Sequence, residues 1–329
     1  MSSKRIRTGD AAASPSRRRL LTAAAVAPVL VGAGAAAAQA EPGHHGGHAA
    51  LQPVPTTNAD WQGVADVLSR SGTVNGGAVY KVGLPRRDLH VTSYGVTIKP
   101  GLSLGGYAVF ARYQDGRTLM MGDLVVTEGE LQRATDALHA GGLEQTAIHK
   151  HLLAHEPAIW WTHFHGMAED PAVLARALKS ALDTTAIPPA VPAGPPPALD
   201  LDTVGIDDAL DAKGVNDGGI YKFTFKRCET VTEHGRILPP AMGVTTALNF
   251  QPLGGGRAAI NGDFCMTADE VQDVLTALRH GGINVVELHN HGLMDEPRLF
   301  YCHFWAVEDA VVLARALRAA VDATNTTPA

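Results

Sequence analysis

The chain has 329 residues, 45% of them hydrophobic, which is enough for two domains of ordinary size with a core in each. Its formal net charge is -6 at pH 7, and no basic stripe occurs beyond the extreme N-terminus, which argues against a nucleic-acid partner. The three cysteines lack CxxC spacing, which excludes a zinc ribbon, whereas the fifteen histidines gather mainly in short clusters.

Residues 1–40 have the pattern of a bacterial export signal. The segment Ser16–Leu21 is similar to a twin-arginine motif, an apolar run continues to Ala38, and Ala38–Ala40 has the small residues of a cleavage site. The alternative is a transmembrane anchor, but alanine, valine and glycine dominate the run and insert weakly. We therefore expect cleavage near Ala40 and a secreted protein without a stable membrane anchor.

A short histidine-containing segment, residues 41–58, follows the predicted signal. It includes His44, His45 and His48 among glycines, and we expect it to be flexible. Such a segment either captures metal loosely or is an ordinary tail.

Two tandem copies of one unit make up the rest of the chain, at residues 59–186 and 199–329. From Gly122 onward the two copies match at a constant offset of 140 residues without a gap. Residues 187–198 between them contain six prolines, which favour an extended, semi-rigid linker. The matched pairs are Tyr80-Lys81 with Tyr221-Lys222, Gly122-Asp123 with Gly262-Asp263, and Gly141-Gly142 with Gly281-Gly282.

The order of elements in each copy predicts an α+β fold. Capping boxes begin helices at Glu128–Ala140 and Ala268–His280, and a Gly-Gly pair ends each one. A hairpin of two strand-like runs and a second helix come next, after upstream strands. We predict that each copy is an antiparallel sheet with two helices on one face, a ferredoxin-like βαββα core plus N-terminal strands. The other copy would then cover the second sheet face, so that the two units pack on each other.

The hairpin of each copy has the pattern HxH, eleven residues, then H. Two histidines at spacing two on a strand point to the same face, so both rings can reach one ion. Neutral imidazole suits zinc or copper, and also iron or nickel. The third histidine joins the pair only if the hairpin register keeps it on that face, which the sequence alone does not fix. The candidate metal ligands are His149, His151, His163 and the additional His165 in copy one, and His289, His291 and His303 in copy two.

Two carboxylates are candidates for catalysis. Glu156 and Glu296 lie in the turns of the two hairpins, where each could be a fourth ligand, a support for a ligand, or a general base. The alternative for both is an ordinary solvated turn residue. For the histidines, the alternatives to metal binding are a metal-free catalytic or substrate-binding cluster, or a purely structural role.

These motifs together resemble the LppY/LpqO-type bacterial proteins, whose shared domain has no known function. The resemblance spans roughly residues 60 to 325 and implies a secreted protein or lipoprotein, but it supplies no reaction. The chain departs from that pattern in lacking a lipid-attachment cysteine and in having Lys150 and His155 in copy one. We therefore expect an exported protein with a histidine-ligated transition metal and a possible metalloenzyme activity. The alternative is a non-catalytic module that binds a metal or a small organic ligand outside the cytoplasm.

Overall fold

The computed structural model describes residues 49–192 and 194–329. The predicted export signal and His44, His45 and His48 therefore lie outside the described residues. Within the described ranges no helix is long and apolar enough to cross a membrane.

The first repeat contains one large antiparallel sheet in the order β1-β2-β5-β6-β9-β7. Strands β6 and β7 both lie beside β9, so the segment from β6 through a helix to β7 encloses a third strand, as in ferredoxin-like folds. A smaller sheet, β4-β3-β8, is attached to the hairpin. The strands are β1 Thr73–Asn75, β2 Val79–Pro85, β3 Thr92–Ser93, β4 Val96–Thr97, β5 Gly105–Arg112, β6 Thr118–Thr127, β7 Glu144–His149, β8 His155–Glu156 and β9 Ile159–Ala168.

The second repeat has the same strand order, β10-β11-β14-β15-β18-β16, with β19 added beside β11. Its smaller sheet is β13-β12-β17. The equal order in both repeats confirms the predicted α+β class and the duplication. The strands are β10 Val215–Asp217, β11 Ile220–Arg227, β12 Thr232–Glu233, β13 Arg236–Ile237, β14 Thr245–Gly254, β15 Arg257–Thr267, β16 Asn284–His289, β17 Asp295–Glu296, β18 Leu299–Asp309 and β19 Thr326–Pro328.

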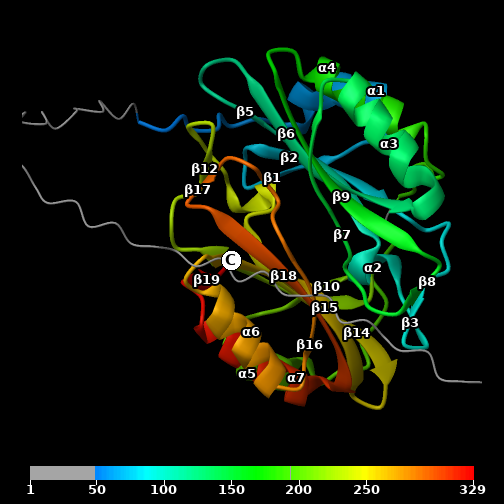
Figure 1. Cartoon of the computed structure of the whole chain (residues 1–329), viewed down its shortest axis with the longest axis vertical. Helices are drawn as coiled ribbons and strands as arrows, with labels where there is room; N and C mark the ends of the chain where they lie inside the picture. The colour runs from blue at the N-terminus through cyan, green and yellow to red at the C-terminus, as the bar shows by residue number, and fades with distance from the viewer. Residues whose placement is uncertain (1–48, 193) are drawn as a thin grey trace, which may run out of the picture. The chain divides into compact units, whose positions relative to one another are not determined.

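Three helices, rather than the two that we predicted, cover the outer face of each large sheet (Figure 1). The short helices α1 and α5 are the additional ones, and each packs on the last helix of its repeat. The helices are α1 Gln62–Leu68, α3 Glu128–Ala140 and α4 Pro171–Leu182 in the first repeat, α5 Thr203–Leu210, α6 Val271–His280 and α7 Ala310–Asp322 in the second, with α2 Pro100–Ser103 and the 3-10 turns Asn58–Trp61 and Pro240–Met242 in loops.

The helix boundaries follow from local capping. Thr127 and Glu130 form the predicted capping box, and α3 has the predicted bounds. Helix α6 instead begins at Val271, three residues later than predicted, because residues 268–270 form a turn. There the Thr267 hydroxyl donates to the Asp269 carboxylate at 2.7 Å rather than capping the helix.

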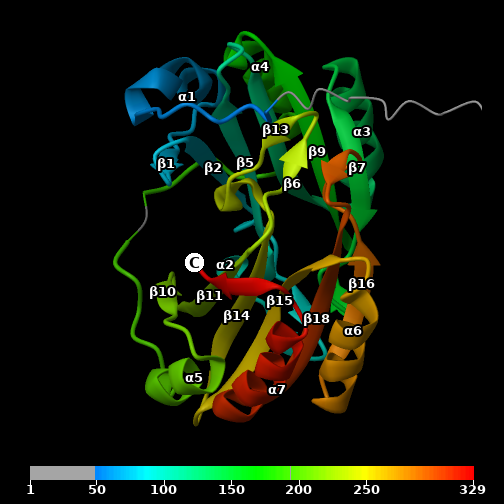
Figure 2. The ribbon, with the colours of Figure 1, turned by 90° about the vertical axis from the view of Figure 1, so that its left-hand side faces the viewer.

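The inner faces of the two sheets pack against each other (Figures 1 and 2). One shared apolar cluster joins Val109 and Met121 to Met242 and Tyr301, and a second joins Trp161 to Trp305. Burial of such clusters holds the repeats together at roughly 25 cal/mol for each Å² of apolar surface removed from water. Between these apolar clusters lies a set of polar side chains from both sheets, and these form the candidate site.

Candidate metal centre

The hairpin register places the third histidine of each repeat on the same sheet face as the HxH pair. In the first repeat Ala147 lies opposite His163 and His149 lies opposite Trp161 across β7 and β9. Side chains directly opposite each other share a face, and so do Trp161 and His163, which are two residues apart on β9. His149 and His163 therefore both point to the inner side. In the second repeat His289 lies opposite Tyr301 on β18, which gives the same arrangement. The question that the sequence left open is therefore answered by the register.

The six matched histidines converge at the contact between the repeats. The ring centroids of His149 and His289 are 4.0 Å apart, and these two rings are stacked. His151 lies 3.8 Å from His303, and His163 lies 4.1 Å from His291. Each of these three pairs joins one repeat to the other. We expected each repeat to build its own triad, whereas the structure forms one composite cluster.

Three groups of side chains bring their ligand atoms within 4.8 Å of one another. Two of these groups share no residue. The groups are His149 with His151 and His303, Asp263 with His289 and His291, and the overlapping set His149, His163 and His289.

Two aspartates that we did not assign to the site lie among the histidines. Asp123 and Asp263 are opposite His163 and His303 in the strand ladders and therefore share their face. The Asp263 carboxylate lies 3.0 Å from His291 Nε2, and the Asp123 carboxylate lies 3.5 Å from His151 Nε2. The signal was present in the sequence as the repeated Gly-Asp pair, but it needed the strand register to be interpreted.

The glycine of each Gly-Asp pair has a packing reason. A Cβ on Gly122 would lie 2.3 Å from the Phe164 ring, and a Cβ on Gly262 would lie 2.0 Å from the Ala247 carbonyl oxygen. No side chain can occupy these positions without a shift of the neighbouring strand. The glycines thus let the adjacent strands approach closely while the aspartates face inward.

Backbone carbonyls orient three of the rings. His303 Nδ1 donates to the Gly262 carbonyl at 2.7 Å, His163 Nδ1 to the Gly122 carbonyl at 3.3 Å, and His291 Nδ1 to the Gly243 carbonyl at 3.0 Å. A ring that donates from Nδ1 keeps its lone pair on Nε2, which is the arrangement of histidine ligands in metal sites.

Several buried ring nitrogens and carboxylate oxygens of the cluster have no hydrogen-bond partner within the described residues. An unpartnered buried polar atom is unfavourable by about 1–3 kcal/mol, and native proteins contain few of them. Their concentration at one place is what we expect of atoms that bind a ligand. These atoms are His149 Nδ1, His163 Nε2, both ring nitrogens of His289, His303 Nε2, and one oxygen each of Asp123 and Asp263.

Burial favours the neutral form of His149 and His151, and it is neutral imidazole that binds metal. Burial lowers the pKa of His149 and His151 well below the ordinary value, and the neighbouring imidazoles lower it further. Burial and the nearby Asp263 charge raise the pKa of Asp123 well above its ordinary value. Burial also acts to raise the pKa of Asp263, but the surrounding imidazoles of His303, His291 and His289 outweigh it and lower that pKa to about 2.

Each HxH segment is held by the other repeat. The Thr146 hydroxyl donates to the His291 carbonyl at 2.5 Å, and the Asn290 amide donates to the Thr146 carbonyl at 2.9 Å. The Asn261 amide donates to the His151 carbonyl at 2.7 Å. These bonds fix the two hairpins against each other, so the composite cluster depends on the packing of the repeats.

The remaining predicted site residues lie apart from the six histidines. His165 is buried, but its Nδ1 pairs with the Glu233 carboxylate at 3.0 Å, and His165 belongs to none of the three groups. Glu156 and Glu296 are exposed on β8 and β17 of the two small sheets. Neither glutamate lines the cavity beside the histidines. The turn bends away from the strands that carry the histidines, so our expectation that these carboxylates reach the cluster is not met.

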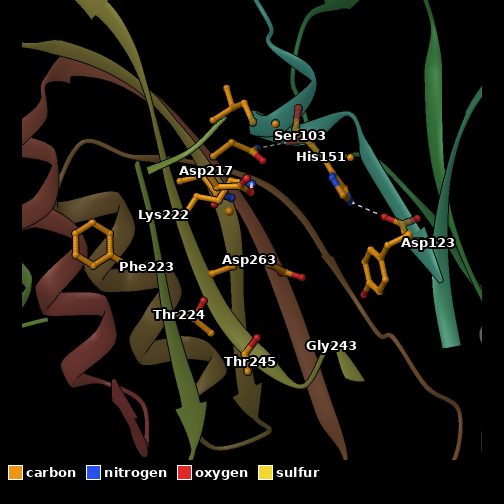
Figure 3. Close-up of a pocket in the computed structure, with 18 of the residues that line it drawn as sticks. Ser103, Asp123, His151, Asp217, Lys222, Phe223, Thr224, Gly243, Thr245 and Asp263 are labelled. Carbon is orange, nitrogen blue, oxygen red and sulfur yellow. Dashed lines mark hydrogen bonds and ion pairs between the residues drawn. The ribbon is translucent and has the colours of Figure 1, made fainter. Parts of the chain in front are cut away.

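A cavity of about 660 Å³ opens beside the cluster, between the two sheets (Figure 3). Figure 3 shows His151 near Asp123 on one side and Lys222 with Asp217 on the other. His163, His291 and His303 also line it. Four of the six histidines are therefore reachable by a small molecule.

The solved structures that are similar to the chain include three examples, two of which are named as microcompartment shell proteins. They are MSM0271 of the RMM microcompartment (11% identity, 63% of this chain, 82% of that chain, TM-score 0.18), PduB (13%, 74%, 86%, 0.19) and EtuB from Clostridium kluyveri (14%, 79%, 94%, 0.19). Such low scores carry no argument about function. No curated protein matches the chain.

A family model matches both repeats, at residues 62–184 and 204–323. The two matches coincide with the two sheets and their helices, and together they span most of the chain. The family is described only as a domain of unknown function (DUF1259). The chain belongs to this family and carries two tandem copies of its domain.

Proposed function

We propose that this protein binds transition metal at the joint between its two repeats, in a centre with room for two ions. The observation that carries the proposal is the presence of two ligand groups with no residue in common, among which buried ring nitrogens lack partners. Zinc or copper is the expected metal, because imidazole and carboxylate donors suit both.

The spacing of the donor atoms supports this proposal. His149 Nε2 and His151 Nε2 are 3.0 Å apart. Two nitrogens that each bind a tetrahedral zinc ion at about 2.1 Å lie about 3.4 Å from each other. Only a small movement of either ring would then be needed to bring both onto one ion.

The cavity favours a metalloenzyme over a scavenger. A bound zinc or copper ion with an open position supplies a Lewis acid and an activated water. Four histidines of the cluster face a cavity large enough for a small substrate. A storage or structural site would instead be expected to be closed.

Export is part of the same proposal. The twin-arginine-like segment and the following apolar run predict a secreted protein, and the LppY/LpqO-type resemblance points the same way. Twin-arginine export carries folded proteins, so metal can be inserted before the chain leaves the cytoplasm.

Metal analysis of the purified full chain tests the proposal. We expect about two ions per chain by inductively coupled plasma mass spectrometry after loading with zinc or copper. The variant His149→Ala/His289→Ala should lose most of this metal. The control His139→Ala/His280→Ala changes two exposed histidines in the last turns of α3 and α6 and should keep it. Absence of stoichiometric metal in the wild type, or equal loss in both variants, would contradict the proposal.

A further inference from the structure

The inner faces of the two sheets are unusually polar beside the histidine cluster. Where two sheets pack face to face, the facing side chains normally form an apolar core. Here Lys81, Lys222, Asn249 and Thr224 lie on the inner side and line the cavity. Lys81 and Thr224 keep exposed surface and Lys222 and Asn249 are half-buried, so a polar ligand that enters the cavity can reach polar groups of both sheets.

Lys81 is the cation in this cavity that no carboxylate neutralises. No acidic group among the described residues lies within ion-pair distance of its ammonium, which is 4.8 Å from the centre of the Tyr107 ring. Its side chain keeps solvent-accessible surface, so a ligand can reach it. Lys222, the matched lysine of the second repeat, is instead paired with Asp217 at 2.7 Å.

The strand registers place Lys81 and the histidines along one wall. Tyr107 lies opposite Asp123 across β5 and β6, and Asp123 lies opposite His163 across β6 and β9. The Lys81 ammonium, which lies over the Tyr107 ring, is therefore at one end of this row of side chains, and the histidine cluster is at the other end. The acidic groups of the cavity are engaged elsewhere, since Asp123 and Asp263 contact histidines.

We propose that the cavity binds a small organic acid with two polar ends. One carboxylate pairs with Lys81, and the other end reaches the open positions of the metal centre. This inference rests on the proposed function, because the second end needs bound metal. Burial and the charge of Lys222 lower the pKa of Lys81, and the negative charge of an arriving carboxylate opposes that lowering. The amide of Asn249 and the hydroxyl of Thr224 provide further hydrogen-bonding groups on the facing sheet.

Calorimetric titration of the zinc-loaded full chain with succinate, and with acetate as the one-ended comparison, tests this inference. We expect succinate to bind at least tenfold more tightly than acetate. Lys81→Met keeps the aliphatic stem against Tyr107 but removes the charge, and it should weaken succinate binding about tenfold while acetate binding changes little. Asp217→Asn frees Lys222 from its ion pair and should strengthen succinate binding several-fold.

The control variant is Lys179→Met, which removes an ion-paired lysine from the outer helix α4 and should leave succinate binding unchanged. The zinc content of every sample is measured in parallel. Zinc retained without a preference for succinate, or without an effect of Lys81→Met, would overturn the inference and leave the proposed function standing. A wild-type chain that does not retain zinc would overturn both.

Discussion

The two repeats agree at the candidate metal-ligand positions and differ in what surrounds them. All three histidines and the aspartate have a counterpart at an offset of 140 residues. Around them, Tyr107 corresponds to Ala247, Met121 to Asn261, and His165 to Trp305. The candidate ligand set is therefore symmetric, whereas the cavity wall and the side chains that contact the ligands are not.

The asymmetry has a physical consequence for the two aspartates. Asp263 has His289, His291 and His303 within 4 Å, at 3.9, 3.0 and 3.8 Å, whereas Asp123 has His151 alone at 3.5 Å. Burial therefore dominates at Asp123, and neighbouring imidazoles dominate at Asp263. The two halves of the centre are expected to bind metal with unequal strength.

The largest expected effect distinguishes a composite centre from one site in each repeat. In the composite centre, His151 and His303 serve the same ion, so His151→Ala/His303→Ala should lose one ion and keep the other. His303 belongs to the group of His149 and His151, whereas His291 belongs to the group of Asp263 and His289, so His291→Ala/His303→Ala should lose both ions. The measurement is the zinc content per chain by mass spectrometry.

If each repeat instead held its own ion, the two variants would give the opposite zinc contents. The pair from one repeat, His291 with His303, would then leave one ion in the other repeat. That result, with circular dichroism showing both variants folded, would refute the composite centre.

A second comparison concerns the buried arginine of each repeat. Arg86 is 1% exposed and pairs with the buried Glu130 at 2.7 Å. Its counterpart Arg227 pairs with Glu270, which is only partly buried. Glu130→Ala leaves a buried charge short of its partner and should lower the free energy of unfolding by about 3–5 kcal/mol.

The matched variant Glu270→Ala should have a smaller effect, because water can reach the position of the lost carboxylate. Urea unfolding monitored by tryptophan fluorescence gives both values. Neither variant should change the metal content of the folded protein. Equal losses of stability would show that burial does not distinguish the two pairs.

The sequence predicted the duplication and the fold class because both depend on local patterns. Capping boxes, Gly-Gly helix ends and hairpin spacing indicate where elements begin and end. The additional helices α1 and α5 were missed because each is only seven or eight residues long. The small sheets were missed because their strands contain two residues each.

The candidate site was only partly predictable. The six matched histidines could be named from the sequence, but their grouping across repeats depends on how two sheets pack, which no local pattern encodes. Asp123 and Asp263 appeared as a repeat without a role, because strand alternation had to be combined with register to place them inward. Glu156 and Glu296 were chosen for proximity in sequence, which a bend in the hairpin makes misleading.

A smaller effect should separate the two aspartates. Asp263→Asn removes a carboxylate of one ligand group, so it should weaken zinc binding by at least about 10–100-fold, the range for groups that only orient metal ligands. Asp123→Asn keeps a neutral side chain where burial already favours the protonated carboxyl, so it should weaken zinc binding less. Competition titration with a chromophoric zinc chelator measures both constants. A larger effect of Asp123→Asn would reverse the assigned asymmetry.

The smallest expected effect is the pH dependence of stability without metal. Burial lowers the pKa of five cluster histidines, so the unfolded chain binds protons at a higher pH than the folded chain does. These histidines are His149, His151, His163, His289 and His303. Stability should therefore be greatest above the ordinary histidine pKa of about 6.5 and should fall as pH decreases below it.

Each histidine contributes at most about 1.4 kcal/mol per pH unit to this slope. The raised pKa of Asp123 acts in the opposite direction, because the folded chain then binds the proton that the unfolded chain has lost. Urea unfolding of the metal-free chain between pH 5 and 8 should show the decline. Because His149 and His289 hold equivalent positions on the two sheets, His149→Gln and His289→Gln should reduce the slope by similar amounts. A slope unchanged by either substitution would mean that water hydrates both rings and that burial does not favour their neutral form.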